Sequence, residues 1–81
     1  MTPTQFDVLY GVALNRSASW FEAPERNETT SDLVAWGLIN KIDPHRPDTG
    51  TDHRSYRFTD KGAALWKGAN TWKDARHLRL P

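Results

Sequence analysis

The fold is decided by the stretch Tyr56-Arg57-Phe58-Thr59-Asp60-Lys61-Gly62, which predicts the end of a strand followed at once by the start of a helix. Strand alternation places Tyr56 and Phe58 on one face of the strand. Thr59 can accept hydrogen bonds from the first free amides of a helix, and Gly62 allows that helix to approach the sheet closely. We therefore predict a strand over residues 54–59 and a helix that begins after Thr59.

The stretch Leu33-Val34-Ala35-Trp36-Gly37-Leu38-Ile39 predicts the end of a helix running into a strand. Asn27 or Thr29 is the expected cap of this helix, which should reach about residue 36. Gly37 would end it by taking the left-handed conformation that other residues resist. Residues 38–42 then predict a strand, and residues 43–52, rich in Pro, Asp, Gly and Thr, predict a loop. The two strands should form a β-hairpin with a long tip.

The spacing of apolar side chains predicts an N-terminal helix and gives the extent of the helix that begins after Thr59. The first should run from about Thr4 to Asn15, capped by Thr2 or Thr4, because its apolar residues recur at helical intervals: Phe6, Leu9, Tyr10, Ala13 and Leu14. The helix that Thr59 caps should reach about Asp74 despite Gly68, since a second set also recurs: Gly62, Leu65, Trp66, Ala69 and Trp72. One domain over residues 1–75, followed by a basic tail over 76–81, is the expected organisation.

Residues 16–28 admit two predictions. Trp20 and Phe21 form an isolated aromatic pair among polar and small residues. Pro24 cannot continue a helix that began before it, so any helix here has one or two turns at most. A short strand over residues 19–22 is the equal alternative.

Size and composition exclude several classes of protein. The chain of 81 residues is long enough for one domain, and without cysteine it forms neither disulfides nor a cysteine-ligated zinc site. No stretch approaches the roughly 20 apolar residues of a membrane span, and we expect a cytoplasmic location. Charge is uneven: residues 1–40 hold two arginines against five acidic residues, whereas residues 41–81 hold nine basic residues against five aspartates.

The order helix, helix, Gly-Leu-Ile, strand, loop, strand, capped helix resembles the winged helix-turn-helix of the MarR and PadR regulators. Residues 33–39 look like the end of the recognition helix running into the first wing strand. Residues 56–62 are similar to the second wing strand, and the resemblance covers about Thr29 to Trp66. It implies an α+β winged helix of three helices with a two- or three-stranded antiparallel wing.

DNA binding is the function that this resemblance implies, in a transcription regulator or a phage or mobile-element accessory protein. Thr29, Thr30 and Ser31 would face the groove of double-stranded DNA. Three wing arginines would contact the duplex, chiefly at its phosphates: Arg46, Arg54 and Arg57. A homodimer is possible, because half-site reading relies on two-fold symmetry.

Protein binding on the same fold is the alternative. The predicted recognition helix carries Glu28 and Asp32 near its start, where DNA readers place basic or amide side chains. The chain also has more aromatic residues than a small core needs. The candidate partner-binding residues are Trp20, Phe21, Trp72, Lys73 and Arg76. A phage-encoded inhibitor of a host complex, of the anti-CRISPR kind, would fit these features.

Catalysis and cofactor binding are not expected. No Ser-His-Asp motif, glycine-rich phosphate loop or paired-carboxylate setting is visible. Residues 43–53 do hold oxygen and nitrogen ligands, but nothing in the sequence supplies the ordered second shell that a metal site needs: Asp43, His45, Asp48, Asp52 and His53. We expect no metal, no cofactor and no small-molecule substrate.

Overall fold

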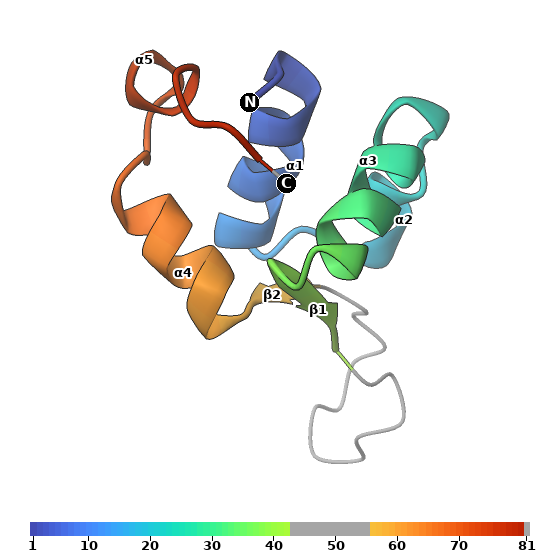
Figure 1. Ribbon diagram of the computed structural model, residues 1–81. Coiled ribbons are helices and arrows are strands. Elements are labelled where there is room, and N and C mark those ends of the chain that lie inside the picture. The colour runs from blue at the N-terminus through green and yellow to red at the C-terminus, as the bar shows by residue number, and fades with distance from the viewer. Residues whose placement is uncertain (43–55, 81) are drawn as a thin grey trace.

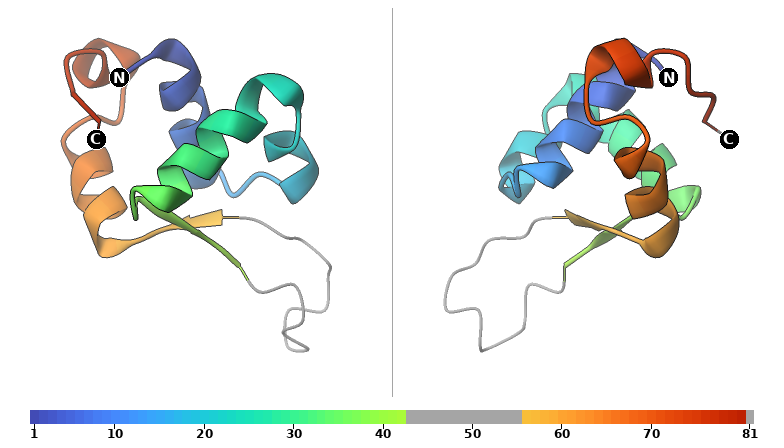
Figure 2. Two further views of the ribbon diagram at one scale, coloured as in Figure 1. Left: turned by 45° about the vertical axis from the view of Figure 1, so that its right-hand side comes forward. Right: turned by 90° about the vertical axis from the view of Figure 1, so that its left-hand side faces the viewer.

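The computed structural model describes residues 1–42 and 56–80 as a small α+β fold, whose layout is compatible with a winged helix. Figures 1 and 2 show the helices gathered on one side of a two-stranded antiparallel sheet. The elements in chain order are α1 (Pro3–Ala13), α2 (Ala18–Phe21), α3 (Pro24–Ala35), β1 (Ile39–Lys41), β2 (Tyr56–Phe58), α4 (Asp60–Lys67) and α5 (Trp72–Ala75). Among these described helices, none is long and apolar enough to cross a membrane.

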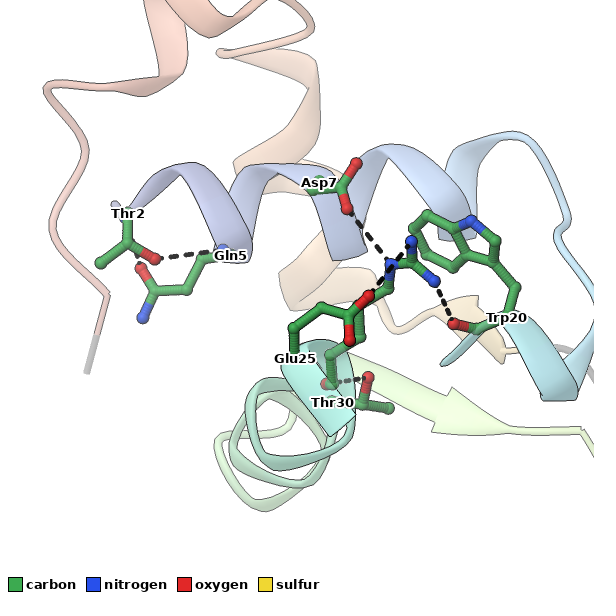
Figure 3. Close-up of polar contacts among 7 residues, drawn as sticks. Thr2, Gln5, Asp7, Trp20, Glu25 and Thr30 are labelled. Atoms are coloured by element: carbon green, nitrogen blue, oxygen red, sulfur yellow. Dashed lines mark hydrogen bonds and ion pairs between the residues drawn. The ribbon is translucent and has the colours of Figure 1, made fainter. Parts of the chain in front are cut away.

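Helix α1 begins at the first of its two predicted caps. The Thr2 hydroxyl accepts a hydrogen bond from the Gln5 amide at 3.1 Å, and Gln5 Oε1 accepts one from the Thr2 amide at 2.8 Å (Figure 3). This reciprocal pair satisfies two amide groups that the helix itself leaves free. The helix ends at Ala13, two residues before the predicted end, and Asn15 follows with φ 55°.

Helix α2 covers Ala18–Phe21, so the predicted alternative of a strand over 19–22 is wrong. Helix α3 begins at Pro24, and the expected cap at Asn27 or Thr29 is also wrong, because both lie inside the helix. Proline suits the first helical position, where its missing N–H would have had no partner. Ala23 stands at the cap without a side-chain hydrogen bond. Helix α3 therefore begins at least a turn earlier than predicted and ends at Ala35.

The sheet pairs β1 with β2 in antiparallel register, with Ile39 opposite Phe58 and Lys41 opposite Tyr56. Ile39 is buried, while Arg57 in the centre of β2 is exposed. Gly37 has φ 75°, which confirms its predicted left-handed end to α3. The predicted loop over residues 43–52 lies outside the described residues.

The core lies between α1, α3 and the sheet. Its largest fully buried side chains come from α1, α2, α3 and the start of the hairpin: Val8, Leu9, Phe21, Leu33, Leu38 and Ile39. Phe21 is 1% exposed and its ring lies 4.8 Å from that of Tyr56, so α2 is joined to the hairpin through aromatic packing. The predicted role of Phe21 in binding a partner is therefore wrong.

The C-terminal helix is broken into two, contrary to the prediction of one helix reaching about Asp74. Helix α4 begins after Thr59 as predicted, and the Thr59 hydroxyl accepts from the Gly62 amide at 3.1 Å. It ends at Lys67 with Gly68 as its C-cap. Thr71 then caps the short helix α5, because its hydroxyl accepts from the Asp74 amide. A second cap so close to a glycine favours a new start over a continuous helix.

The segment after α5, predicted to be a basic tail, returns to the body of the domain. The Met1 ammonium donates a hydrogen bond to the Leu78 carbonyl, and the Leu78 amide donates to the Ala75 carbonyl at 2.9 Å. Leu80 packs against the buried core. Figure 1 shows the two ends of the chain on the same side of the molecule as a result.

Gly62→Ala should lower the free energy of unfolding by about 2 kcal/mol or more, as overpacking against rigid groups does. A Cβ at residue 62 would lie 1.8 Å from the Leu38 carbonyl oxygen, so backbone must move. Gly68→Ala is the matched control at the end of α4, because its Cβ would meet nothing closer than 3.6 Å. Urea unfolding followed by circular dichroism measures both variants. Equal stability of the two would contradict the close approach of α4 to Leu38.

Candidate interaction surface

Helix α3 stands in the predicted recognition position and presents an acidic outer face. Glu25, Glu28 and Asp32 are all exposed along it. Thr30 is only 2% exposed, and its hydroxyl donates to the Arg26 carbonyl at 2.8 Å. The predicted contact of Thr30 with a DNA groove is therefore wrong, since its side chain points into the domain. Two other residues predicted to face the groove remain accessible to different degrees, with Thr29 half-buried and Ser31 exposed.

Arg26 supplies the one positive charge of α3, and its partly buried guanidinium is engaged by Asp7, Trp20 and Glu25, which Figure 3 labels. Its Nη1 donates to the Trp20 carbonyl at 2.6 Å, and its Nε donates to Asp7 Oδ2 at 3.3 Å. The guanidinium carbon also lies 3.9 Å from the centre of the Trp20 ring, a cation–π contact. A weaker ion pair joins Nη2 to Glu25 at 3.7 Å. The outer face of α3 is therefore anionic and would be repelled by DNA phosphates.

Trp20, a predicted anchor for a partner, is half-buried and makes several internal contacts. Its ring lies below Arg26 and meets Phe21 edge-on at 5.0 Å. A Cβ at Gly11 would come within 2.3 Å of the same ring, so the glycine makes room for it against α1. Trp20 thus joins α1, α2 and α3, which is a structural role.

The largest group of accessible aromatic side chains lies where α1, α4 and α5 meet. We call it the aromatic cluster, and its members are Phe6, Tyr10, Trp66 and Trp72. Phe6 is at its centre, with ring centroids 5.9 Å from Tyr10, 5.6 Å from Trp66 and 5.6 Å from Trp72. Tyr10 is 45% exposed and Trp72 is 37% exposed. Each offers part of an aromatic ring to solvent while the rest is held by neighbours.

Basic residues lie next to the two tryptophans of the aromatic cluster along the chain. Lys67 ends α4, and Lys73 and Arg76 project from α5 and its C-cap, all of them exposed. The carboxylate of Asp74 is engaged, because it accepts a hydrogen bond from the Thr71 hydroxyl at 2.9 Å. The structure therefore brings together three of the predicted partner-binding residues in one exposed region: Trp72, Lys73 and Arg76.

Phe6, Tyr10 and Trp66 belong to this surface although their helical spacing predicts core positions. The spacing identifies a helix face that is shielded from water on average. It does not show that α5 leaves α4 at Gly68 and covers only part of that face. The sequence indicates such a surface in one way: with aromatic residues at positions 6, 10, 66 and 72, the chain holds more aromatic side chains than a small core needs.

The predicted wing contacts lie mostly outside the described residues. Arg57 is exposed in the centre of β2, whereas Arg46 and Arg54 fall in residues 43–55. Burial raises the pKa of the Tyr56 phenol above its ordinary value, and the negative charge of Glu22 raises it further. Tyr56 is therefore neutral at pH 7 and adds no charge to the hairpin.

No metal site is visible in the part of the chain that the structure describes, where no three His, Cys, Asp or Glu side chains lie close enough to share an ion. The candidate ligands over residues 43–53 lie outside it. Comparison with protein-family models, with curated proteins and with solved structures finds no match to this chain.

Arg26→Lys should lower the free energy of unfolding by about 1–2 kcal/mol, because lysine lacks the planar fork that serves Asp7 and Trp20 together. Arg16→Lys is the matched control at an exposed position between α1 and α2, and we expect a change within about 0.5 kcal/mol. Thermal and urea unfolding measure both. If Arg26→Lys is as stable as the control, Arg26 is not held as described and its charge is free to serve α3.

Proposed function

We propose that this domain is a protein-binding module on a winged-helix scaffold, which binds an acidic and apolar segment of a partner through the aromatic cluster. The observation that carries the proposal is the exposure of Tyr10 and Trp72, with exposed Lys73 and Arg76 on the same helix as Trp72 and at its C-cap. In the winged-helix interpretation, α2 and α3 form the helix-turn-helix and the β1–β2 hairpin forms the wing.

The aromatic cluster has the chemistry of an interface centre. Tyrosine, tryptophan and arginine are the residues that most often dominate binding energy between proteins. Here the exposed rings are already positioned by contacts with Phe6, so little side-chain freedom would be lost on binding. The exposed basic residues select a partner segment that carries carboxylates. An amphipathic helix with apolar residues on one face and acidic residues beside them fits this description.

The charge of α3 favours a protein partner over DNA. A helix-turn-helix reads DNA by placing its recognition helix in the major groove, close to the phosphates. Glu25, Glu28 and Asp32 would meet those phosphates, and Arg26 is engaged with Asp7 and Trp20. DNA binding through Ser31, Arg57 and the wing stays a prediction of the family resemblance.

Peptide display tests the proposal directly, because selection from random peptides requires no identified partner. Selection of random peptides of about 16 residues on the immobilised protein should enrich sequences that combine Leu, Phe or Trp with Asp or Glu. Trp72→Ala and Tyr10→Ala should each weaken binding of a selected peptide by about 10-fold or more in fluorescence polarisation. Val34→Ala is the matched control, because Val34 is 39% exposed but lies on α3. Its affinity should remain within about twofold of the wild type.

Charge reversal separates binding from folding, since Trp72→Ala also removes packing against Phe6. Lys73→Glu combined with Arg76→Glu changes only exposed side chains and should abolish binding of an acidic peptide while the melting temperature is kept. Retained binding in this double variant, or enrichment of basic peptides, would contradict the proposal. Loss of binding in Val34→Ala equal to that in Trp72→Ala would contradict it as well.

A further inference from the structure

A groove of about 610 Å³ runs between α4 and the C-terminal segment, on the side of α4 that carries Ala64 and Leu65. Leu38 belongs to the buried core and Leu80 packs against it, so the apolar lining continues that core to the surface. Among the described residues, the groove is lined by Leu38, Lys61, Ala64, Leu65, Arg79 and Leu80. None of these residues belongs to the aromatic cluster, so the groove is a second surface.

Two positive side chains lie at the groove, and within the described residues its lining holds no carboxylate. Lys61 Nζ donates to the Trp36 carbonyl at 3.3 Å, which holds the ammonium above the end of α3. Arg79 is exposed on the opposite wall. In the part of the chain that the structure describes, neither forms an ion pair with an acidic side chain within 4.0 Å. Within residues 1–42 and 56–80, an apolar floor is thus combined with two positive side chains that no acidic side chain pairs with.

The wall formed by the C-terminal segment is held in place by the rest of the domain. The Met1 ammonium bonds to the Leu78 carbonyl, one residue before Arg79. Leu80 is anchored against the core on the other side of Arg79. The groove is therefore formed before a ligand arrives, which lowers the entropy cost of binding.

We propose that this groove binds the free C-terminus of a partner protein that ends in apolar residues. The terminal carboxylate would accept charge-assisted hydrogen bonds from Lys61 and Arg79, which are stronger than bonds between neutral groups. One or two apolar side chains would lie over Leu65 and Leu80. The groove volume falls within the range of about 300–1,000 Å³ that ligand sites occupy.

A peptide end fits this groove better than a fatty acid does. Lys61, Ala64 and Arg79 are all exposed, so the groove is open along its length. A peptide backbone can remain hydrated on that open side while its side chains are buried. A long alkyl chain would leave much of its apolar surface in water.

The test compares acetyl-Gly-Gly-Leu-Leu with the same peptide closed by a C-terminal amide, titrated into the full chain labelled with ¹⁵N. We expect the free acid to shift amide signals of Ala64, Leu65 and Leu80, with an affinity about 10-fold or more above that of the amide. Lys61→Gln and Arg79→Gln should each weaken the free acid by about fivefold or more. Arg16→Gln, an exposed arginine outside the groove lining, is the matched control and should leave the affinity unchanged.

Equal binding of acid and amide would overturn the proposal, as would unchanged affinity in both groove variants. Saturable binding of decanoate without binding of the free-acid peptide would overturn it in favour of a small amphiphile. Trp72→Ala distinguishes the two surfaces, because it should weaken the display-selected peptide and leave the free-acid peptide unaffected. The proposal for the groove is therefore tested independently of the proposal for the aromatic cluster.

Discussion

The contact between α4 and the residues that precede β1 is the constraint on which the rest of the structure depends. The Thr59 amide donates to the Leu38 carbonyl at 3.1 Å, and the Thr59 hydroxyl donates to the Gly37 carbonyl. Gly62 lies so close to Leu38 that no side chain fits between them. One short junction thus joins the end of α3, the hairpin and the start of α4.

Both proposed surfaces follow from this junction. Because α4 is held against the hairpin, Trp66 lies beside Phe58 and reaches Phe6 and Tyr10 on α1. The same placement directs Lys61 to the carbonyl end of α3, where Lys61 also lines the groove between α4 and the C-terminal segment. The chain also separates charge: α3 has an acidic outer face, whereas the exposed Lys67, Lys73 and Arg76 lie at the end of α4, in α5 and at the C-cap of α5, so the two regions suit different partners.

Local signals predicted the junction well. Thr59 and Gly62 act at a helix start, and Gly37 acts at a helix end, so their roles depend on neighbours in the chain. The predicted start of α3 was wrong because Asn27 and Thr29 have side chains that commonly cap helices. Ala23 provides no cap, and contacts of Arg26 with Asp7 and Trp20 stabilise the first turn instead. Such contacts join distant residues and leave no mark in the local sequence.

The candidate surface was predicted only in part for a similar reason. Trp72 was correctly expected to be accessible, whereas Phe21 became core because α2 turns it toward Tyr56. Tyr10 shows the opposite outcome, since its helical spacing predicts burial but it is half exposed. The exposure of an aromatic residue depends on which helix covers it. Here the break between α4 and α5 leaves Tyr10 and Trp72 partly uncovered.

Titration of a fluorescent random duplex of about 20 base pairs at low salt is the most direct test of whether this domain binds DNA. A protein-binding domain with an acidic α3 should show no saturable binding at protein concentrations up to about 100 µM in about 50 mM salt. Saturable binding in that range, weakening with added salt at a log–log slope of about −0.9 for each phosphate contacted, would contradict a protein-binding role and restore DNA as the ligand.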